Sequence, residues 1–123
     1  MAYLGDGVIE ILVREKLVKA GNIPPEHLHT KALLFVRATA QSKAMENILP
    51  RLSEPELDIY KRGRNAKNRA PKSAPPADYR RATGMECLFG YLYLSGEHDR
   101  ISELFNIAFG GIKEIEEIRE IKP

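Results

Sequence analysis

The chain has 123 residues, of which 43% are hydrophobic and 29% are charged, and its formal net charge is +2. This length and composition allow one domain with a buried core and exclude a low-complexity chain. Because no apolar run approaches the roughly 18 residues that a membrane span needs, we expect no membrane segment. The acidic N-terminus predicts no secretory signal, and one cysteine excludes an internal disulfide and a cysteine-based zinc site. We therefore expect a single domain, residues 1–123, in the reducing cytoplasm.

Helices are predicted along most of the chain. Apolar residues recur every four positions in residues 2–20, and basic residues in the last turn favour a helix end there. A second helix is predicted to open at Pro24 and Pro25 and to reach Val36. The same pattern resumes at residues 40–49 and stops near Pro50. These segments predict a helical N-terminal half.

The second half of the chain has clearer helix boundaries. Ser53 and Glu56 form a candidate capping box for a helix that ends near Gly63. Asp78 is the predicted N-cap of a helix over residues 79–94, which is apolar almost all round and should lie at the centre of the fold. Asp99 is the predicted N-cap of the last helix, which a stripe of isoleucines at residues 112–121 continues. No strand-like alternation persists, so the predicted fold class is an all-α bundle.

Basic charge is concentrated in one segment. Residues 61–81 contain eight Lys or Arg and one Asp, a net charge of +7, whereas the flanking parts of the chain are both acidic. The part of this segment from residue 64 to 77 has three prolines and no apolar periodicity, which predicts an exposed loop. A solvated loop is the ordinary interpretation of such a run, but a merely soluble loop would mix both signs of charge. The segment is therefore the predicted docking site for a polyanion.

Two carboxylates are candidates for chemistry. Asp6 lies within a Gly-Asp-Gly sequence next to apolar residues, and Glu86 lies inside the most apolar helix. A buried carboxylate must be paired, must bind a metal, or must have a raised pKa. If the two helices pack together, Asp6 and Glu86 could form part of a Mg²⁺ site.

Each candidate also has a structural interpretation. Glu86 could pair with Arg80 or Arg81, and Asp6 could be a first-turn acid at the helix N-terminus. Glu10 is better explained by a surface ion pair with Arg14, one helical turn away. The three histidines lack metal-ligand spacing, and Cys87 is expected to be a buried, inert thiol.

Sequence motifs add a family resemblance. Tyr3-Leu4-Gly5-Asp6-Gly7-Val8 and the segment from Glu86 to Leu94 resemble the two signature blocks of ribonuclease III domains. The run Arg62-Gly63-Arg64-Asn65-Ala66-Lys67, together with residues 79–86, resembles the Mini-ribonuclease III branch. That branch consists of the nuclease domain without a double-stranded-RNA-binding domain. The resemblance covers about residues 2–96 and implies the helical bundle of a ribonuclease III endonuclease domain.

The resemblance implies a Mg²⁺-dependent endoribonuclease that cuts double-stranded RNA as a homodimer. In the Mini branch the usual substrate is a precursor of large-subunit ribosomal RNA, and a ribosomal protein is a further candidate partner. By position, Asp6 and Glu86 match the metal-binding catalytic carboxylates. The basic loop, about residues 61–78, is then the predicted RNA-contacting element. Its candidate RNA-binding residues are Arg62, Arg64, Asn65, Lys67, Arg69, Lys72 and Arg80.

Two departures from the full-length family keep an alternative open. Full-length ribonuclease III has further acids at the positions of Ala2 and Thr83, which the Mini branch also lacks. The short segment before Asp6 places that residue near an expected fraying helix end. The alternative function is therefore a non-catalytic RNA-binding or ribosome-assembly module on the same fold. A third interpretation, an adaptor that uses the isoleucine stripe, would leave the basic loop unexplained.

Overall fold

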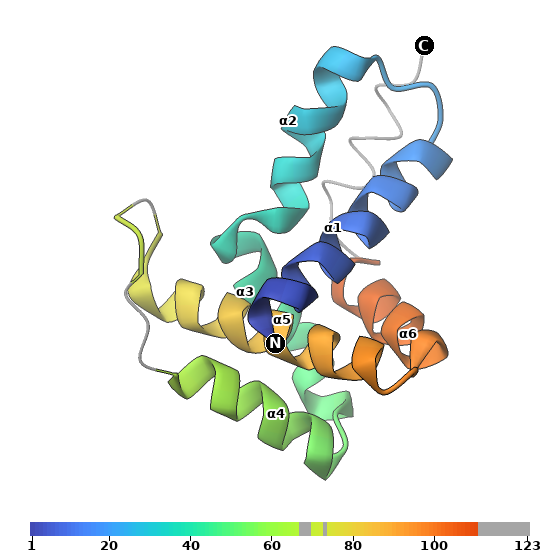
Figure 1. Cartoon of the computed structure of the whole chain (residues 1–123). Helices are drawn as coiled ribbons and strands as arrows, with labels where there is room; N and C mark the ends of the chain where they lie inside the picture. The colour runs from blue at the N-terminus through green and yellow to red at the C-terminus, as the bar shows by residue number, and fades with distance from the viewer. Residues whose placement is uncertain (67–69, 73, 111–123) are drawn as a thin grey trace.

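The fold was analysed in a computed structural model, which describes residues 1–66, 70–72 and 74–110. The described residues form helices joined by short connections and contain no strand (Figure 1). The elements are α1 (Ala2–Lys19), α2 (Pro25–Val36), α3 (Ala38–Ile48), the 3₁₀ turn η1 (Leu49–Arg51), α4 (Glu54–Asn65), α5 (Pro76–Leu94) and α6 (His98–Phe109). The all-α prediction is confirmed. None of these helices is both long and apolar enough to cross a membrane.

Helix α5 crosses the middle of the molecule, as the sequence predicted (Figure 1). It packs against α1, α3 and α4, and more lightly against α6. Eight of its residues are buried, including Met85, Leu88 and Phe89. An amphipathic helix with one polar face could not make all of these contacts, which explains why this segment is apolar almost all round.

Glycines let α5 approach its neighbours at backbone distance. A methyl group added to Gly5 in α1 would overlap the carbonyl oxygen of Glu86 and would lie 2.9 Å from its Cα. A methyl group on Gly90 would lie 2.5 Å from the Met1 carbonyl oxygen. Since real Cβ atoms essentially never come within 3.0 Å of another atom, both positions require glycine. The start of α1 is therefore held against α5, where a fraying end was expected.

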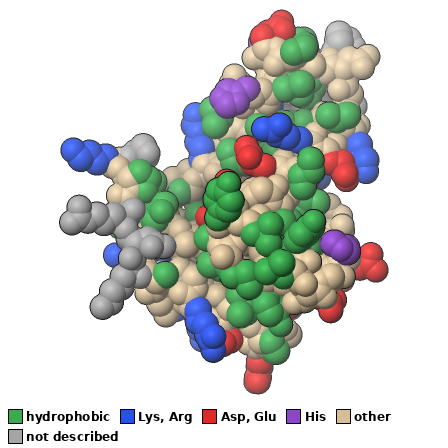
Figure 2. Space-filling model, in the orientation of Figure 1, with side chains coloured by type: hydrophobic (Ala, Val, Ile, Leu, Met, Phe, Trp, Pro, Cys, Tyr) green, Lys and Arg blue, Asp and Glu red, His purple; other side chains and the backbone are tan. Residues whose placement is uncertain are grey.

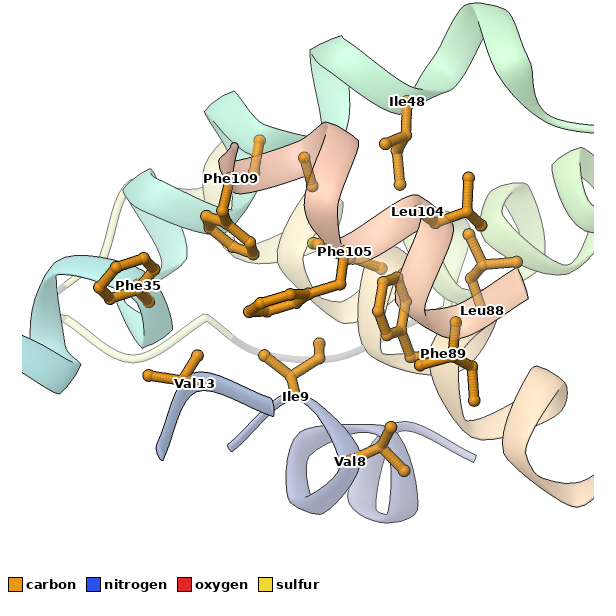
Figure 3. Close-up of a cluster of buried hydrophobic side chains, with 14 of the residues drawn as sticks. Val8, Ile9, Val13, Phe35, Ile48, Leu88, Phe89, Leu104, Phe105 and Phe109 are labelled. Atoms are coloured by element: carbon orange, nitrogen blue, oxygen red, sulfur yellow. The ribbon is translucent and has the colours of Figure 1, made fainter. Parts of the chain in front are cut away.

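The core joins α6 to the N-terminal helices (Figure 3). The Phe35 ring meets the Phe109 ring edge-on with centroids 5.5 Å apart, and Phe105 lies 5.0 Å from Phe109. Ile9 from α1 and Leu104 from α6 are fully buried in the same cluster. Burying one such side chain contributes about 1.5–3 kcal/mol, so these contacts fix the position of α1 and, with it, the position of Asp6.

A polar cluster fixes the start of α4. Ser53 and Glu56 form the predicted capping box, with the Ser53 amide donating to Glu56 Oε1 at 2.8 Å. Arg100 from α6 donates to both carboxylate oxygens of Glu56, at 2.8 and 2.9 Å, and to the Arg51 carbonyl oxygen at 2.8 Å. This bidentate ion pair lowers the pKa of Glu56. It ties the end of η1 and the start of α4 to α6.

Three helix boundaries differ from their prediction. Asp78 is not an N-cap, because α5 already begins at Pro76, two residues before Asp78. Proline suits the first turn of a helix, where the amide N–H that it lacks would have no acceptor within the helix. Asp99 is not an N-cap either, since Glu97 holds that position in α6. Helix α4 continues past Gly63 to Asn65, and Gly63 instead makes room for Cys87. The isoleucine stripe at residues 112–121 lies outside the described residues.

Candidate active site and RNA surface

Asp6 and Glu86 meet where α1 crosses α5. The contact between Gly5 and the Glu86 backbone brings the two helices together at this point. The pKa of Glu86 is raised to about 8, mainly by burial, with smaller contributions from a hydrogen bond with Asp6 and from the charge of Asp6. The two side chains, eighty positions apart in the sequence, therefore lie close enough to interact, and their role as a metal site stays a prediction.

The alternative pairings proposed for Glu86 and Asp6 are not observed among the described residues. Arg81 lies 3.8 Å from Asp78 and donates to Ser42 at 3.3 Å, and no ion pair of Glu86 occurs within the described parts of the chain. Asp6 lies in the second turn of α1, beyond the positions where an acid satisfies the helix N-terminus. Two facing carboxylates repel each other once both are ionised.

Glu10 and Cys87 are outside the carboxylate pair, as expected. Glu10 forms a surface ion pair with Arg14 at 3.8 Å. Cys87 is half-buried rather than fully buried, and burial raises the pKa of its thiol. A raised thiol pKa lowers the fraction of the reactive thiolate, which agrees with an inert residue.

A cavity of about 640 Å³ opens beside Glu86. Its walls come from three parts of the chain: the start of α3, one face of α5, and described residues of the basic loop. Thr83 lines it one turn before Glu86 and donates to the Tyr79 carbonyl oxygen at 2.9 Å. Glu86 thus borders a space large enough to admit part of a ligand.

Gln41 is a cavity residue that the sequence analysis did not select. It is 1% exposed and lines the same cavity as Glu86. A signal was present, because Gln41 shares the apolar face of its helix with Ala44, Met45 and Ile48. A glutamine on a buried face requires hydrogen-bond partners and so is a candidate for a special role.

The donor set fits a hydrated divalent cation. Within residues 1–66, 70–72 and 74–110 no group of three or more His, Cys, Asp or Glu side chains could hold a metal. Two carboxylates remain at the α1–α5 crossing, and their mutual repulsion is relieved by a cation. Mg²⁺ commonly takes one or two protein carboxylates and keeps several waters, so a site this lean in acids is compatible with it.

The predicted RNA-contacting residues differ in how they are held. Arg62 pairs with Asp58 at 3.1 Å, and the Arg64 guanidinium lies 5.6 Å from the centre of the Tyr60 ring and donates to Asn65 Oδ1 at 3.2 Å. Lys72 and Arg80 are exposed. Lys67 and Arg69 lie outside the described residues. The described basic residues therefore lie at the end of α4, in the loop and at the start of α5.

Comparison with known proteins identifies the class. Residues 1–97 match the family model of the ribonuclease III domain. A crystal structure of a protein from Fusobacterium nucleatum superimposes with a TM-score of 0.82 at 30% identity, covering 94% of this chain and 90% of that one. The fold and the matched segment define the protein as an endoribonuclease of the ribonuclease III class.

Individual relatives narrow the assignment. The Mini-ribonuclease 3 of Symbiobacterium thermophilum is 49% identical over 109 residues, which is 88% of this chain and 84% of the relative. The Mini-ribonuclease 3 of Brevibacillus brevis is 44% identical over 110 residues, 89% of this chain and 82% of the relative. The chain belongs to the Mini-ribonuclease 3 family of ribonuclease III domains, and the predicted resemblance is confirmed.

Proposed function

We propose that this endoribonuclease cleaves double-stranded RNA with Mg²⁺ and matures a precursor of large-subunit ribosomal RNA in the cytoplasm. The observation that carries the proposal is the pairing of Asp6 with Glu86, a residue that lines an open cavity. The basic segment next to this cavity supplies charge of the sign that an RNA backbone requires.

In this proposal Asp6 and Glu86 hold the metal and are the catalytic residues. A bound Mg²⁺ supplies a water of lowered pKa and stabilises negative charge on the phosphodiester. Glu86 must be ionised to bind a cation, although its pKa is about 8 without one. Glu86 would therefore give up its proton when it holds the cation, and Asp6 would serve as the second ligand.

The basic loop positions the duplex in front of these carboxylates. A-form RNA presents phosphates and 2′-hydroxyls more readily than base edges, so Lys and Arg contacts should give affinity rather than sequence choice. Replacing Arg64, Lys67 and Arg69 together should weaken duplex binding and reduce its dependence on salt concentration, measured by equilibrium titration at several salt concentrations. An unchanged salt slope would contradict this role for the loop.

A second copy of the chain is the proposed partner at the start of α1. Tyr3 is 95% exposed, and Leu94 at the end of α5 is 66% exposed. Hydrophobic side chains gather on this face in Figure 2. Exposed aromatic residues of this size favour an interface. Tyr3→Glu should convert a dimer to a monomer in light scattering. A ribosomal protein partner stays a prediction.

The proposal is tested by incubating the purified protein with long duplex RNA in Mg²⁺ or EDTA and separating the products on a gel. We expect cleavage only in Mg²⁺, and none by Asp6→Asn or Glu86→Gln although both still bind RNA. Glu10→Gln is the matched control, because Glu10 lies one helical turn from Asp6 and pairs with Arg14, and it should cleave normally. Binding without cleavage by the wild-type protein would favour the non-catalytic RNA-binding module.

A further inference from the structure

We propose that the cavity beside Glu86 binds one nucleotide of the RNA backbone, with its phosphate at the start of α3 and its 2′-hydroxyl at Gln41. This inference rests on the proposed function and adds to it a group that distinguishes RNA from DNA. Three features support it: the cavity, the exposed start of α3, and the unpaired oxygen of Gln41.

The cavity connects the carboxylates to the RNA-contacting loop. Glu86 and Thr83 form its α5 wall, Arg37 and Gln41 form its α3 wall, and Pro71 of the basic loop borders it. At about 640 Å³ it has room for a nucleotide-sized group. An RNA backbone that enters along the loop would therefore reach this cavity beside Glu86. The phosphodiester bond to be cut would then lie next to the nucleotide held in the cavity.

The start of α3 offers an anion site. Arg37 is the N-cap residue, and its side chain makes no capping hydrogen bond. The first amides of a helix have no acceptor within the helix and lie at the positive end of its dipole, an arrangement that favours phosphate. The Arg37 side chain is exposed, and no ion pair involving it occurs in the part of the chain that the structure describes.

Gln41 gives the independent observation that a ligand enters this cavity. Its Nε2 donates to the Val36 carbonyl oxygen at 3.3 Å, which orients the amide. Its Oε1 is buried and has no hydrogen-bond partner among the described residues. The Thr83 hydroxyl in the same cavity is occupied, because it donates to the Tyr79 carbonyl oxygen. Buried acceptors are nearly always satisfied in folded proteins, so we assign to Oε1 a donor from a ligand in this cavity.

The chemistry of RNA identifies that donor. Backbone phosphates and ring oxygens only accept hydrogen bonds, and the free N–H groups of paired bases lie in the grooves rather than on the backbone. The 2′-hydroxyl is the one donor on the sugar–phosphate backbone, and DNA lacks it. Oε1 is shielded in this structure, so a rotation of the Gln41 amide that breaks the 3.3 Å bond to Val36 would bring it to this hydroxyl.

The test uses a short duplex RNA whose cut position has been mapped, with single 2′-deoxy substitutions placed in turn at each nucleotide around that position. A single substitution removes one hydroxyl and leaves the A-form helix in place. We expect one position at which the wild-type protein loses about 3- to 10-fold in affinity, the size of one hydrogen bond. Binding is measured in Ca²⁺ and cleavage is measured separately in Mg²⁺.

Variants of Gln41 assign that position. Gln41→Met removes Oε1 while keeping the length of the side chain, so it should bind the all-RNA duplex about 3- to 10-fold more weakly and ignore the 2′-deoxy substitution. Asn47→Leu is the matched control, because Asn47 lies on the same helix and donates to the Ala108 carbonyl oxygen at 3.0 Å, away from the cavity. It should behave as the wild type.

The phosphate end is tested through salt dependence. Arg37→Gln should reduce the slope of log affinity against log salt by about one phosphate contact, whereas Arg51→Gln, an exposed arginine on η1, should not. An unchanged slope in Arg37→Gln would remove Arg37 from the site.

The outcomes separate this inference from the proposed function. If the wild-type protein does not cleave duplex RNA, both fail. If it cleaves RNA but no single 2′-deoxy position weakens binding, or if Gln41→Met remains fully sensitive to that position, only the inference is overturned. Melting temperatures in EDTA show whether each variant is folded, and the 2′-deoxy series on the wild-type protein is informative without any variant.

Discussion

The glycine pair in α1 provides a sharp test of how the carboxylates are brought together. Gly5 and Gly7 lie two residues apart on the same helix, but their surroundings are opposite. An added methyl group at Gly5 would overlap the Glu86 carbonyl, whereas at Gly7 it would meet nothing within 4 Å. We predict that Gly7→Ala stabilises the protein and Gly5→Ala destabilises it.

The expected magnitudes follow from these contacts. Alanine is favoured over glycine inside a helix by up to about 1 kcal/mol, and Gly7→Ala should gain most of this amount. Gly5→Ala gains the same helix preference but must displace α1 from α5, because a backbone carbonyl cannot turn aside as a flexible side chain can. Overpacking of this kind costs about 1–3 kcal/mol. Because both variants gain the same helix preference, they should differ by the overpacking cost alone, about 1–3 kcal/mol in the free energy of unfolding.

The assay is urea denaturation in EDTA, followed by cleavage of duplex RNA in Mg²⁺. Gly7→Ala should cleave at the wild-type rate. Gly5→Ala should lose cleavage even at a temperature where it is folded, because Asp6 moves with the backbone of α1 away from Glu86. Equal stability of the two variants, or full activity in Gly5→Ala, would refute the close contact between α1 and α5.

Three further predictions concern charge. In the metal-free protein Glu86 holds its proton up to about pH 8, whereas in the unfolded chain it releases it near pH 4.5, so the free energy of unfolding should fall as pH rises between these values. Glu86→Gln should abolish this part of the pH dependence in urea denaturation; a wild-type slope in the variant would contradict the raised pKa. Mg²⁺ at one hundred times its Kd should raise the free energy of unfolding by about 2.7 kcal/mol in the wild type and not in Asp6→Asn, measured by thermal or urea denaturation. The pKa of Glu56 is lowered, so its ion pair with Arg100 stabilises the fold at neutral pH, and this stabilisation is lost when Glu56 is protonated in acid. Arg100→Met should therefore cost about 2–3 kcal/mol of unfolding free energy at pH 7 and much less in acid. An equal loss at both pH values would argue against the ion pair.

Much of the fold was predictable because the helices follow an apolar period near 3.6 residues. The central position of α5 followed from its lack of a polar face, and the capping box at Ser53 was correctly placed. The N-caps at Asp78 and Asp99 were wrong because a proline, at Pro76, and a glutamate, at Glu97, mark the starts of these helices. Boundaries depend on such local competition, which a single preferred residue type does not decide.

The carboxylate pair was predictable for a physical reason, because an acid such as Glu86 inside an apolar helix requires a partner or a raised pKa. The sequence offered Asp6 as its neighbour if the two helices packed together, and the family resemblance then supported this pairing. The role of Gly5 was not predictable, because its partner is the backbone of a residue eighty-one positions away. The cavity was missed for a similar reason. Three separate segments form it, and Gln41 acquires an unpaired oxygen only when they assemble.

The central claim is that Asp6 and Glu86 hold one divalent cation between α1 and α5. The most direct test is a crystal of the protein soaked in Mn²⁺, with anomalous scattering data collected to locate the ion. The account predicts an anomalous peak within coordination distance of both carboxylates, and no such peak in Glu86→Gln. A peak elsewhere, or no peak in a wild-type crystal under conditions in which the protein cleaves RNA, would contradict the account.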